Sequence, residues 1–592
     1  MFCSVSYISL LVSVLLGIFA DIDCQVVETR YGKVQGSVGQ SRNGRKYYQF
    51  RGIPYAAPPI LDLRFEPPRK PEPWDGIRDA IRFSEPCLQF EILYLGRVQG
   101  QEDCLKLNVF SPNIPKNEPG GKNLLPVLVF IHGGGFMSGS ANVYKGKYFM
   151  DEDVVLVTLN YRVGALGKCI VKLILPHPLI KNLALQWVQV LFMNYEENNV
   201  VMHYELCHSE LQLQENIANF GGDPHRTTLF GESVGGASVH YHMLSKASEG
   251  LFSRAVSQSG NAMRIYSLTN DRFGQAKVFA KKFGCPTDDS TELVDCLRRV
   301  DGRKLAEAHK EARGNIRDEY SLFAPVIERV KDGGEFIADE PAELLSSGRF
   351  SKIPWLVGVN SGEGLLYTVP IQYDRELLRT LGYPEEWKKY LPTLIGFGDQ
   401  DVVAKNSERI RRQYFQTPIG SDSSFQNHML SVLYYFNHPT KFSLSKLAAA
   451  TSETSVAPPE IQIASYVAGS NNDSMSKLGS WFREYLLGFK RHFYGSYHGD
   501  ELHLLFDFNQ FTEPRIGDPD YELSQEMVKV WVGFASQDSV NQTGLDVQRL
   551  KWKPIDPNDP VPHYLELTLP MRIVKEPFAE RLPFWKDLLN EI

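Results

Sequence analysis

The stretch LFGESVGGAS, residues 229–238, places the small hydroxyl of Ser233 between two glycines directly after an apolar run. This glycine-x-serine-x-glycine pattern is typical of a nucleophile elbow, in which a serine lies on a sharp turn from a strand into a helix. Glycines permit the tight turn, and the dipole of the following helix favours negative charge beside the serine. The same pattern occurs in ordinary glycine–serine loops, so its interpretation depends on the sequence around it.

Apolar runs elsewhere in the chain supply that context. Four short runs rich in β-branched residues predict buried strands of a largely parallel sheet: 127–131, 154–159, 227–230 and 355–359. Helix-like segments follow some of these runs, and the alternation of strand, loop and helix predicts an α/β fold. Active groups in such sheets collect beyond the carboxyl ends of the strands. The motifs HGGGF, GESVGG and NSGEG lie at three of these ends.

The motif HGGGF, residues 132–136, predicts an oxyanion hole. A triple glycine can present bare N–H groups where negative charge develops during acyl transfer. Gly134 and Gly135 are the predicted donors, together with the backbone amide of Val234 directly after the candidate nucleophile. Taken alone, the three glycines also fit a flexible loop, but their occurrence together with the elbow favours the oxyanion hole.

A serine of ordinary pKa is a weak nucleophile and needs an adjacent base. In hydrolases with this elbow the acid and then the histidine follow the serine along the chain. The late histidines are His492, His498, His503 and His563. His498 lies in a glycine-flanked loop and is the predicted base, whereas the position of His503 within the next apolar segment favours a structural role.

Glu363 is the predicted acid, because it follows a predicted strand and stands between two glycines. A carboxylate at that point can hold the imidazole in one tautomer and stabilise the imidazolium. Three rival acids lie in a segment typical of a surface turn and a helix start: Asp332, Glu335 and Asp339.

Composition and targeting signals narrow the class of protein. The chain has 592 residues, of which 43% are hydrophobic, enough for a large core. A net charge of −7 without a dense Lys/Arg run argues against nucleic acid as a partner. Residues 8–19 are nearly all apolar and precede Ala20, a pattern that predicts a signal peptide over 1–20. The alternative is a buried N-terminal helix. The remaining residues, 21–592, are then predicted to form one domain. With no further apolar run of transmembrane length and no lipidation signal, we expect a secreted protein without a membrane anchor.

The cysteines and sequons fit an oxidising compartment. Two pairs flank short loops and look like local disulfides: Cys87 with Cys104, and Cys285 with Cys296. Apart from Cys3 in the predicted signal peptide, three cysteines are left over: Cys24, Cys169 and Cys207. Two Asn-x-Ser/Thr sequons predict N-glycosylation at surface sites: Asn472 and Asn541.

Four separated motifs, EDCLKLNVF, HGGGF, LFGESVGGAS and YHGDEL, together resemble the type-B carboxylesterase and cholinesterase family from about Val26 to about Pro554. The resemblance implies an α/β-hydrolase fold, with a large, mostly parallel central sheet flanked by helices. It also implies the two disulfides above, an oxyanion hole of three backbone amides and a catalytic triad of Ser233, Glu363 and His498. The loop between Cys87 and Cys104 lacks the tryptophan with which cholinesterases hold a quaternary ammonium. The chain is therefore more similar to arthropod general carboxylesterases than to cholinesterases.

Two stretches depart from the family pattern, 168–181 and 190–214, and they contain Cys169 and Cys207. Without residues 190–214 the segment ALQWVQ would join ENIANF as it does in the family, which favours a retained intron or a mis-joined exon. The alternative is a genuine surface insertion, which loops tolerate at small entropic cost. If the insertion is retained, we expect 190–214 to bulge from a helix and 168–181 to replace a loop beside the site.

The sequence thus predicts a secreted serine hydrolase that cleaves small-molecule carboxylic esters through an acyl-enzyme, without a metal or cofactor. Two alternatives use the same fold. One is an adhesion or binding protein, whose relatives typically lose the serine or the histidine and gain a membrane span. The other is a protein that sequesters reactive esters stoichiometrically, which differs from an esterase in a slow deacylation step.

Overall fold

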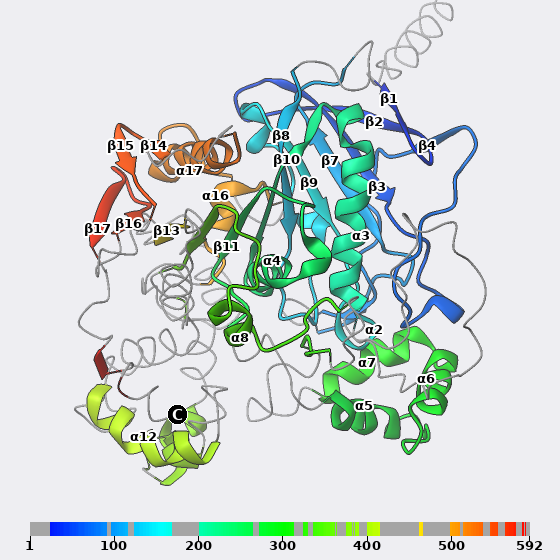
Figure 1. The fold of residues 1–592 in the computed structure, drawn as a ribbon, viewed down its shortest axis with the longest axis vertical. Coiled ribbons are helices and arrows are strands. Elements are labelled where there is room, and N and C mark those ends of the chain that lie inside the picture. Colours follow the sequence, from blue (N-terminus) through cyan, green and yellow to red (C-terminus); the bar gives the residue numbers. More distant parts are fainter. Residues whose placement is uncertain are drawn as a thin grey trace, which may run out of the picture.

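The molecule is built around one large twisted sheet (Figure 1). The computed structural model describes the following residues: 24–91, 96–115, 123–167, 201–263, 272–312, 324–328, 335–360, 363, 375–381, 383, 385–389, 400–414, 461–465, 498–508, 513–536, 545–554, 563–575, 583–584 and 587. The predicted signal peptide lies outside these residues.

The sheet has 13 strands among the described residues. They are β1 (Cys24–Thr29), β2 (Gly32–Gln40), β3 (Lys46–Pro54), β4 (Ile77–Asp79), β7 (Lys106–Ser111), β8 (Leu125–Ile131), β9 (Val155–Leu159), β10 (Gly222–Glu232), β11 (Arg254–Gln258), β12 (Trp355–Gly358), β13 (Ile461–Ser465), β16 (His563–Glu566) and β17 (Arg572–Lys575). Their order is β1-β2-β3-β7-β9-β8-β10-β11-β12-β13-β16-β17, with β4 beside β2. Two small ribbons pair β5 (Gln89–Phe90) with β6 (Val98–Gln99), and β14 (Leu545–Val547) with β15 (Leu550–Trp552).

The centre of the sheet is parallel. The run from β9 through β8, β10, β11, β12 and β13 to β16 pairs in parallel, whereas β1, β2, β3 and β7 at one edge and β17 at the other pair antiparallel. The four predicted strands correspond to β8, β9, β10 and β12. The predicted α/β-hydrolase architecture, a large and mostly parallel central sheet flanked by helices, is confirmed.

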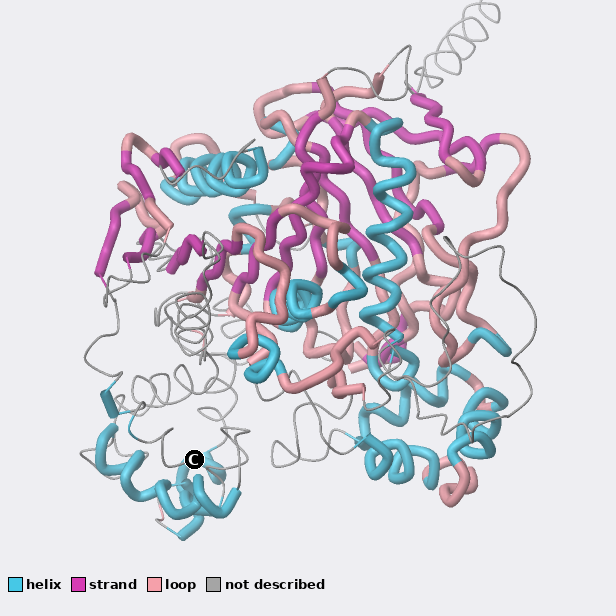
Figure 2. Tube along the Cα trace, in the orientation of Figure 1, coloured by secondary structure: helices cyan, strands magenta, loops and turns pink. Residues whose placement is uncertain are grey.

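Helices cover both faces of the sheet (Figures 1 and 2). The α-helices are α2 (Gly164–Gly167), α3 (Val201–Asn216), α4 (Val234–Leu244), α5 (Arg272–Lys281), α6 (Ser290–Arg299), α7 (Gly302–Ala312), α8 (Pro341–Ser346), α10 (Arg375–Leu381), α12 (Gln400–Tyr414), α16 (Leu502–Leu505) and α17 (Pro519–Ser536). The 3₁₀ turns are η1 (Leu61–Leu63), η2 (Ala141–Val143), η3 (Phe149–Asp151), η4 (Ile217–Phe220) and η5 (Lys246–Ser248). Among the helices that the structure describes, none has the length and apolar composition that crossing a membrane requires.

The two faces of the sheet bury separate cores. Val127 and Val129 of β8 belong to a cluster that includes side chains of α3 and α4, whereas Leu128 and Phe130 belong to a cluster with α16 and α17. Successive strand residues point to opposite faces, so a strand buried on both faces must be apolar at every position. This explains why β8 reads as an unbroken apolar run in the sequence.

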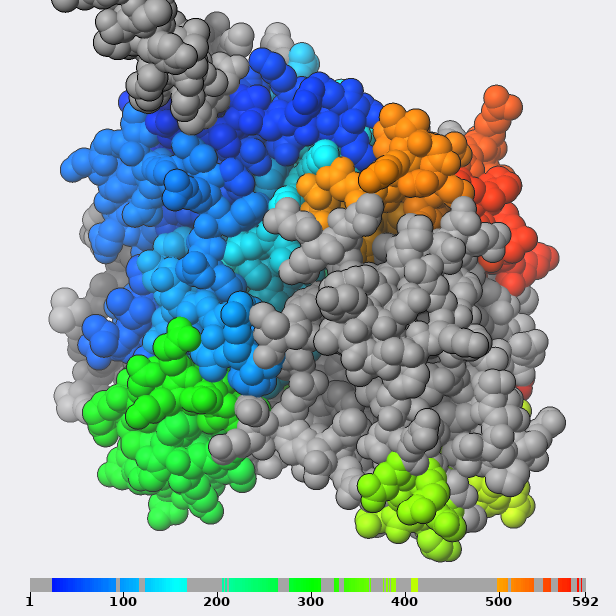
Figure 3. Space-filling model, turned by 180° about the vertical axis from the view of Figure 1, so that it is seen from behind, coloured from blue at the N-terminus to red at the C-terminus, as the bar shows by residue number. Residues whose placement is uncertain are grey.

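A helical lobe lies beyond one end of the sheet, and Figure 3 shows it as a separate corner of the molecule. Helices α5, α6 and α7 share a third apolar cluster with α2. The N-cap of α6 is Asp289, whose side chain accepts hydrogen bonds from the amides of Thr291 and Glu292. The predicted disulfide between Cys285 and Cys296 joins the turn after α5 to α6.

Helix α3 corrects one expectation. Residues 201–214 do not bulge from a helix; they form most of α3 itself, and Leu206 and Leu213 are buried in the core against the sheet. The physical reason is that this segment supplies its own apolar contacts toward the sheet, so it can form a helix that packs against it. Residues 168–200, including 168–181 and Cys169, lie outside the described residues.

Four buried histidines make stability depend on pH. Burial lowers the pKa to about 4 for His132 and His309 and to about 3 for His240 and His242. Because the folded protein excludes the imidazolium, the unfolded chain takes up protons first as the pH falls below 6.5. Their contribution is complete above pH 6.5 and is lost as the pH falls toward 4, by about 2 kcal/mol for each histidine at pH 5.

We therefore expect the melting temperature to fall steeply between pH 6.5 and pH 5 in a calorimetric series. His242→Gln should flatten this slope, because one of the buried imidazoles no longer titrates. The matched control is His225→Gln on the surface, which should leave the slope unchanged. An identical slope in the wild type and in His242→Gln would contradict the account.

Candidate active site

Ser233 lies on the turn between β10 and α4, with φ 59° and ψ −125°. Residues other than glycine rarely adopt such a conformation, which persists only where the surrounding structure enforces it. The amide of Ser233 donates to the carbonyl oxygen of Gln258 on β11 at 2.8 Å, and the amide of Ala237 donates to the carbonyl oxygen of Ser233 at 3.0 Å. A side chain at Gly235 would place its Cβ 2.1 Å from the carbonyl oxygen of Ile131, so only glycine fits there.

His498 lies between two carboxylates. Its Nδ1 is 2.5 Å from Oε2 of Glu363, and its Nε2 is 3.1 Å from Oε1 of Glu232, the residue before Ser233. Oε1 of Glu363 accepts a hydrogen bond from the amide of Asn360 at 2.8 Å, which fixes the carboxylate beyond the end of β12. Glu363 is buried and His498 is 11% exposed, so the imidazole remains accessible from one side. The structure thus brings the predicted base, the predicted acid and the elbow together.

The HGGGF loop lies directly against the elbow. A Cβ built on Gly133 would be 3.1 Å from Cβ of Ser233, whereas one built on Gly135 would meet no atom within 4 Å. The amides of Met137 and Ser138 both donate to the carbonyl oxygen of Gly134 at 3.1 Å and close the loop into a turn. The loop therefore borders Ser233 on one side and open space on the other.

The third predicted donor, the amide of Val234, is the first of α4. The first amides of a helix have no acceptor within the helix, and the helix dipole favours an anion beside them. The predicted oxyanion donors Gly134, Gly135 and Val234 thus come from two segments next to Ser233, the HGGGF loop and the start of α4.

A buried polar cluster beside Glu363 and His498 was not predicted from the sequence. Glu501 is fully buried and accepts hydrogen bonds from Nδ2 of Asn360 at 2.5 Å and from Nε2 of Gln258 at 3.2 Å. Burial raises the pKa of Glu501, and the neighbouring charge of Glu363 raises it further. The available sequence signal was an acid three residues after His498 that opens an apolar segment. The contact of Glu232 with His498 was also missed, although Glu232 lies within the elbow motif.

The structure describes four of the other candidates from the sequence. His503 packs against Phe508 with tilted rings whose centroids are 4.6 Å apart, and burial lowers the pKa of His503 to about 3. His563 begins β16, and Asp339 pairs with Arg349. Glu335 is half-buried and precedes α8 along the chain. Four further candidates lie outside the described residues: Asp332, His492, Asn472 and Asn541.

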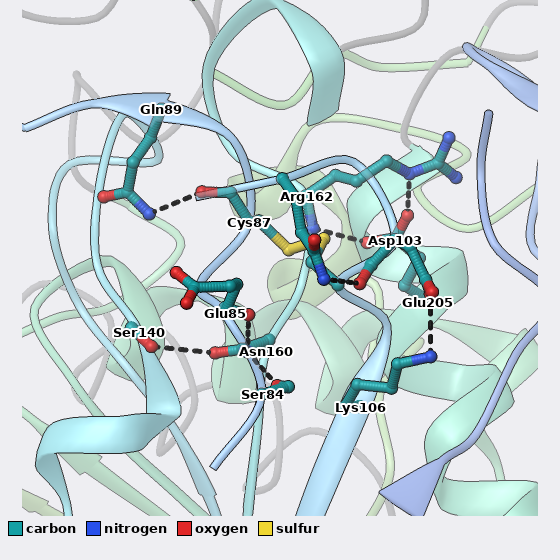
Figure 4. Close-up of a disulfide and its surroundings, with 12 residues drawn as sticks. Ser84, Glu85, Cys87, Gln89, Asp103, Lys106, Ser140, Asn160, Arg162 and Glu205 are labelled. Carbon is teal, nitrogen blue, oxygen red and sulfur yellow. Dashed lines mark hydrogen bonds and ion pairs between the residues drawn. A yellow bond between two sulfur atoms is a disulfide. The ribbon is translucent and has the colours of Figure 1, made fainter. Parts of the chain in front are cut away.

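Both predicted disulfides are present in the structure. The bond between Cys87 and Cys104 lies among buried polar side chains beside Arg162 (Figure 4). Cys24, the first residue of β1, is an exposed free thiol, and Cys207 lies in α3.

Comparisons with known proteins show the family to which the chain belongs. The chain matches the carboxylesterase family over residues 23–170 and 212–585. A carboxylic ester hydrolase from Bombus ignitus is 31% identical over 577 residues, which cover 95% of this chain and 94% of that protein. A juvenile hormone esterase from Tribolium castaneum is 38% identical over 368 residues, 60% of this chain and 58% of that protein. Neuroligin-2 from Mus musculus is 27% identical over 98% of this chain and 69% of that protein.

Fold and comparisons together define an enzyme, a carboxylic ester hydrolase with the α/β-hydrolase architecture. The chain belongs to the carboxylesterase family, as the sequence motifs predicted, and its similarity to insect esterases supports the predicted subfamily. The matched residues skip 171–211, a gap that overlaps the two departures from the family pattern.

The glycines of the HGGGF loop offer a matched pair of substitutions. At Gly134, with φ 110°, an added Cβ would lie 2.0 Å from the carbonyl oxygen of Ser138, so Gly134→Ala must displace the loop backbone. We expect kcat for a small aryl ester to fall about 10²-fold, the effect of losing one oxyanion donor. At Gly135, with φ 65°, the Cβ meets open space.

The control variant Gly135→Ala should therefore cost about 1–2 kcal/mol of stability through its left-handed backbone alone, with less than a tenfold change in kcat. Steady-state kinetics and thermal melting of both variants test this difference. Equal losses of kcat would show that the contact with Ser138 does not govern the loop.

Proposed function

We propose that this chain is a secreted serine esterase that cleaves small carboxylic esters through an acyl-enzyme intermediate. Ser233 is the nucleophile, His498 the general base and Glu363 the acid that orients it. The observation that carries the proposal is the 2.5 Å contact between His498 Nδ1 and Glu363, with Nε2 directed at the residue next to the nucleophile. A base whose second nitrogen is held by a buried carboxylate keeps the tautomer that can accept the serine proton.

The reaction follows from this arrangement. Ser233 Oγ attacks the ester carbonyl as His498 Nε2 accepts its proton, and the oxyanion forms against the amides of Gly134, Gly135 and Val234. The imidazolium then donates its proton to the leaving alcohol, and a water activated by the same histidine hydrolyses the acyl-enzyme.

The charge distribution around the base supports this sequence of steps. During each step the imidazolium lies between the carboxylates of Glu363 and Glu232, both of them buried. In a site from which water is largely excluded, two fixed anions stabilise a transient cation more strongly than solvent does.

The substrate proposal is a small uncharged ester. The loop closed by Cys87 and Cys104 contains no tryptophan, so it lacks the aromatic face that would hold a quaternary ammonium group. The sequence of the elbow carries Glu232, where juvenile hormone esterases usually have glutamine, so we favour a general carboxylesterase over a juvenile hormone esterase.

Secretion is part of the proposal. The apolar segment before Ala20 has the character of a signal peptide, and two disulfides are typical of an oxidising compartment. Glycosylation at Asn472 and Asn541 would be expected in that compartment.

The decisive variant is Ser233→Ala. Fluorophosphonate labelling and turnover of a small aryl ester should both disappear, because the fold remains but the nucleophile is removed. Ser346→Ala, at an exposed position of α8, is the control and should retain both activities. Mass mapping of the adduct on the wild type should place it on the peptide that contains Ser233.

The same experiment separates the esterase from its alternatives. An adhesion or binding protein would show no labelling of the wild type. A sequestering protein would label and release one equivalent of alcohol in a burst, without steady turnover. Sustained turnover that Ser233→Ala abolishes would support the esterase alone.

A further inference from the structure

Helix α3 contributes a buried ion pair to the segment that holds the HGGGF loop. The side chains of Arg162 and Glu205 are 4% and 0% exposed. Oε1 of Glu205 accepts a hydrogen bond from Nε of Arg162, and Oε2 accepts one from its backbone amide at 2.7 Å. Figure 4 shows the pair beside the disulfide of Cys87. Within the described part of the chain, Glu205 is the one carboxylate that forms an ion pair with this guanidinium.

Residues on either side of Arg162 form hydrogen bonds with both ends of the HGGGF loop. The hydroxyl of Tyr161 donates to the carbonyl oxygen of His132 at 2.6 Å, and the two rings stack with centroids 4.2 Å apart. The amide of Gly164 donates to the carbonyl oxygen of Phe136 at 2.7 Å. The HGGGF loop carries the proposed oxyanion donors and is called the oxyanion loop below. Residues 161–164 hold this loop through hydrogen bonds, and Glu205 fixes Arg162 within that segment.

Glu205 lies in the stretch that departs from the family, and outside the residues that match it. The stretch is nevertheless anchored in the fold. Leu206 and Leu213 are buried in the core, and Nε2 of Gln214 donates to the carbonyl oxygen of Leu251 at 3.1 Å. At the end of the helix, Oδ1 of Asn216 accepts a hydrogen bond from the amide of Arg30 at 2.7 Å.

We propose that Glu205 is a positioning residue for the oxyanion loop, and that residues 201–214 are an integral part of this enzyme and not a removable insertion. The first half of the proposal rests on the proposed function, whereas the second half concerns folding alone. Glu205 acts through Arg162: by fixing both its amide and its guanidinium, it fixes Tyr161 and Gly164, and through them the loop. A loosened loop weakens binding of the oxyanion more than binding of the neutral ester.

The sequence shows what a shorter chain would lose. Removing 190–214 shifts the register by 25 residues and brings Ile180 to the place of Glu205. The guanidinium of Arg162 would then be buried without its carboxylate, and an unpaired buried charge is strongly destabilising. The shorter chain restores the family sequence at the end of the helix but removes the charge partner on which the start of the helix depends.

The test of the positioning role uses Glu205→Gln and Glu205→Ala in the full-length chain. The probe is an aryl trifluoromethyl ketone, which forms a hemiketal oxyanion with the serine. We expect kcat and the affinity for the ketone to fall together by about 10- to 100-fold, while KM changes less than about threefold. The fall should be larger for alanine than for glutamine, which can still accept a hydrogen bond from the amide of Arg162.

The matched control is Asp151→Asn. Asp151 pairs with Arg42 at 3.3 Å, and their side chains are 5% and 4% exposed. This variant should lose stability but keep its affinity for the ketone. If Glu205→Gln lowers the melting temperature as Asp151→Asn does but leaves the ketone affinity unchanged, Glu205 is merely structural and the positioning role is wrong.

The integral role of 201–214 is tested by deletion. A chain without 190–214 should be secreted at least about tenfold less and should not react with fluorophosphonate, because it buries an unpaired Arg162. Adding Ile180→Glu to the deletion should restore a large part of the yield. A deletion chain that is secreted and labelled like the wild type would overturn this half of the proposal. A wild type that reacts with neither probe would instead overturn the proposed function and the positioning role, and the secretion yields would still decide the folding half.

Discussion

The backbone of Ser233 is held at φ 59°, and the site depends on the close packing that keeps it there. The turn is clamped between β8 and β11: Gly235 approaches the carbonyl oxygen of Ile131, and the amide of Ser233 is bonded to Gln258. Such strain costs free energy of order 1–3 kcal/mol and persists only in a rigid surround. The parallel centre of the sheet, buried on both faces, provides that rigidity. The conformation of Ser233 therefore depends on the packing of the central sheet.

Buried charge is the second organising feature of the molecule. Three carboxylates, those of Glu232, Glu363 and Glu501, lie around His498, and a fourth, that of Glu205, neutralises Arg162 behind the oxyanion loop. A buried charge is tolerated only when it is paired or fully hydrogen-bonded. Amide donors meet this requirement for Glu363 and Glu501, and the guanidinium of Arg162 meets it for Glu205. These contacts also fix the positions of the groups around Ser233. The polar interior thus serves both folding and the geometry of the site.

The sequence was informative where chemistry is encoded in short motifs. The strands β8, β9, β10 and β12 and the positions of the elbow, the glycine loop and His498 follow from contiguous residues. The cluster of Glu501, Asn360 and Gln258 does not. Asn360 and Gln258 precede Glu501 by 141 and 243 residues, and only the folded sheet brings the three side chains together. The prediction that residues 201–214 bulge from a helix was wrong for a different reason. Sequence similarity to a family shows which segments depart from its pattern, but whether such a segment forms a helix depends on the buried contacts it makes in the fold.

The separation of the site residues along the chain also has a temporal consequence. His498 and Glu363 are 135 residues apart, and the elbow precedes both. On the proposed assignment, a ribosome adding about 5–20 residues each second exposes the serine on the order of tens of seconds before its base. Until then the serine has no group to accept its proton, so on this assignment a nascent chain is inert toward esters. On this assignment, the chain becomes reactive toward esters only at the end of its synthesis, when folding has brought His498 and Glu363 to the elbow.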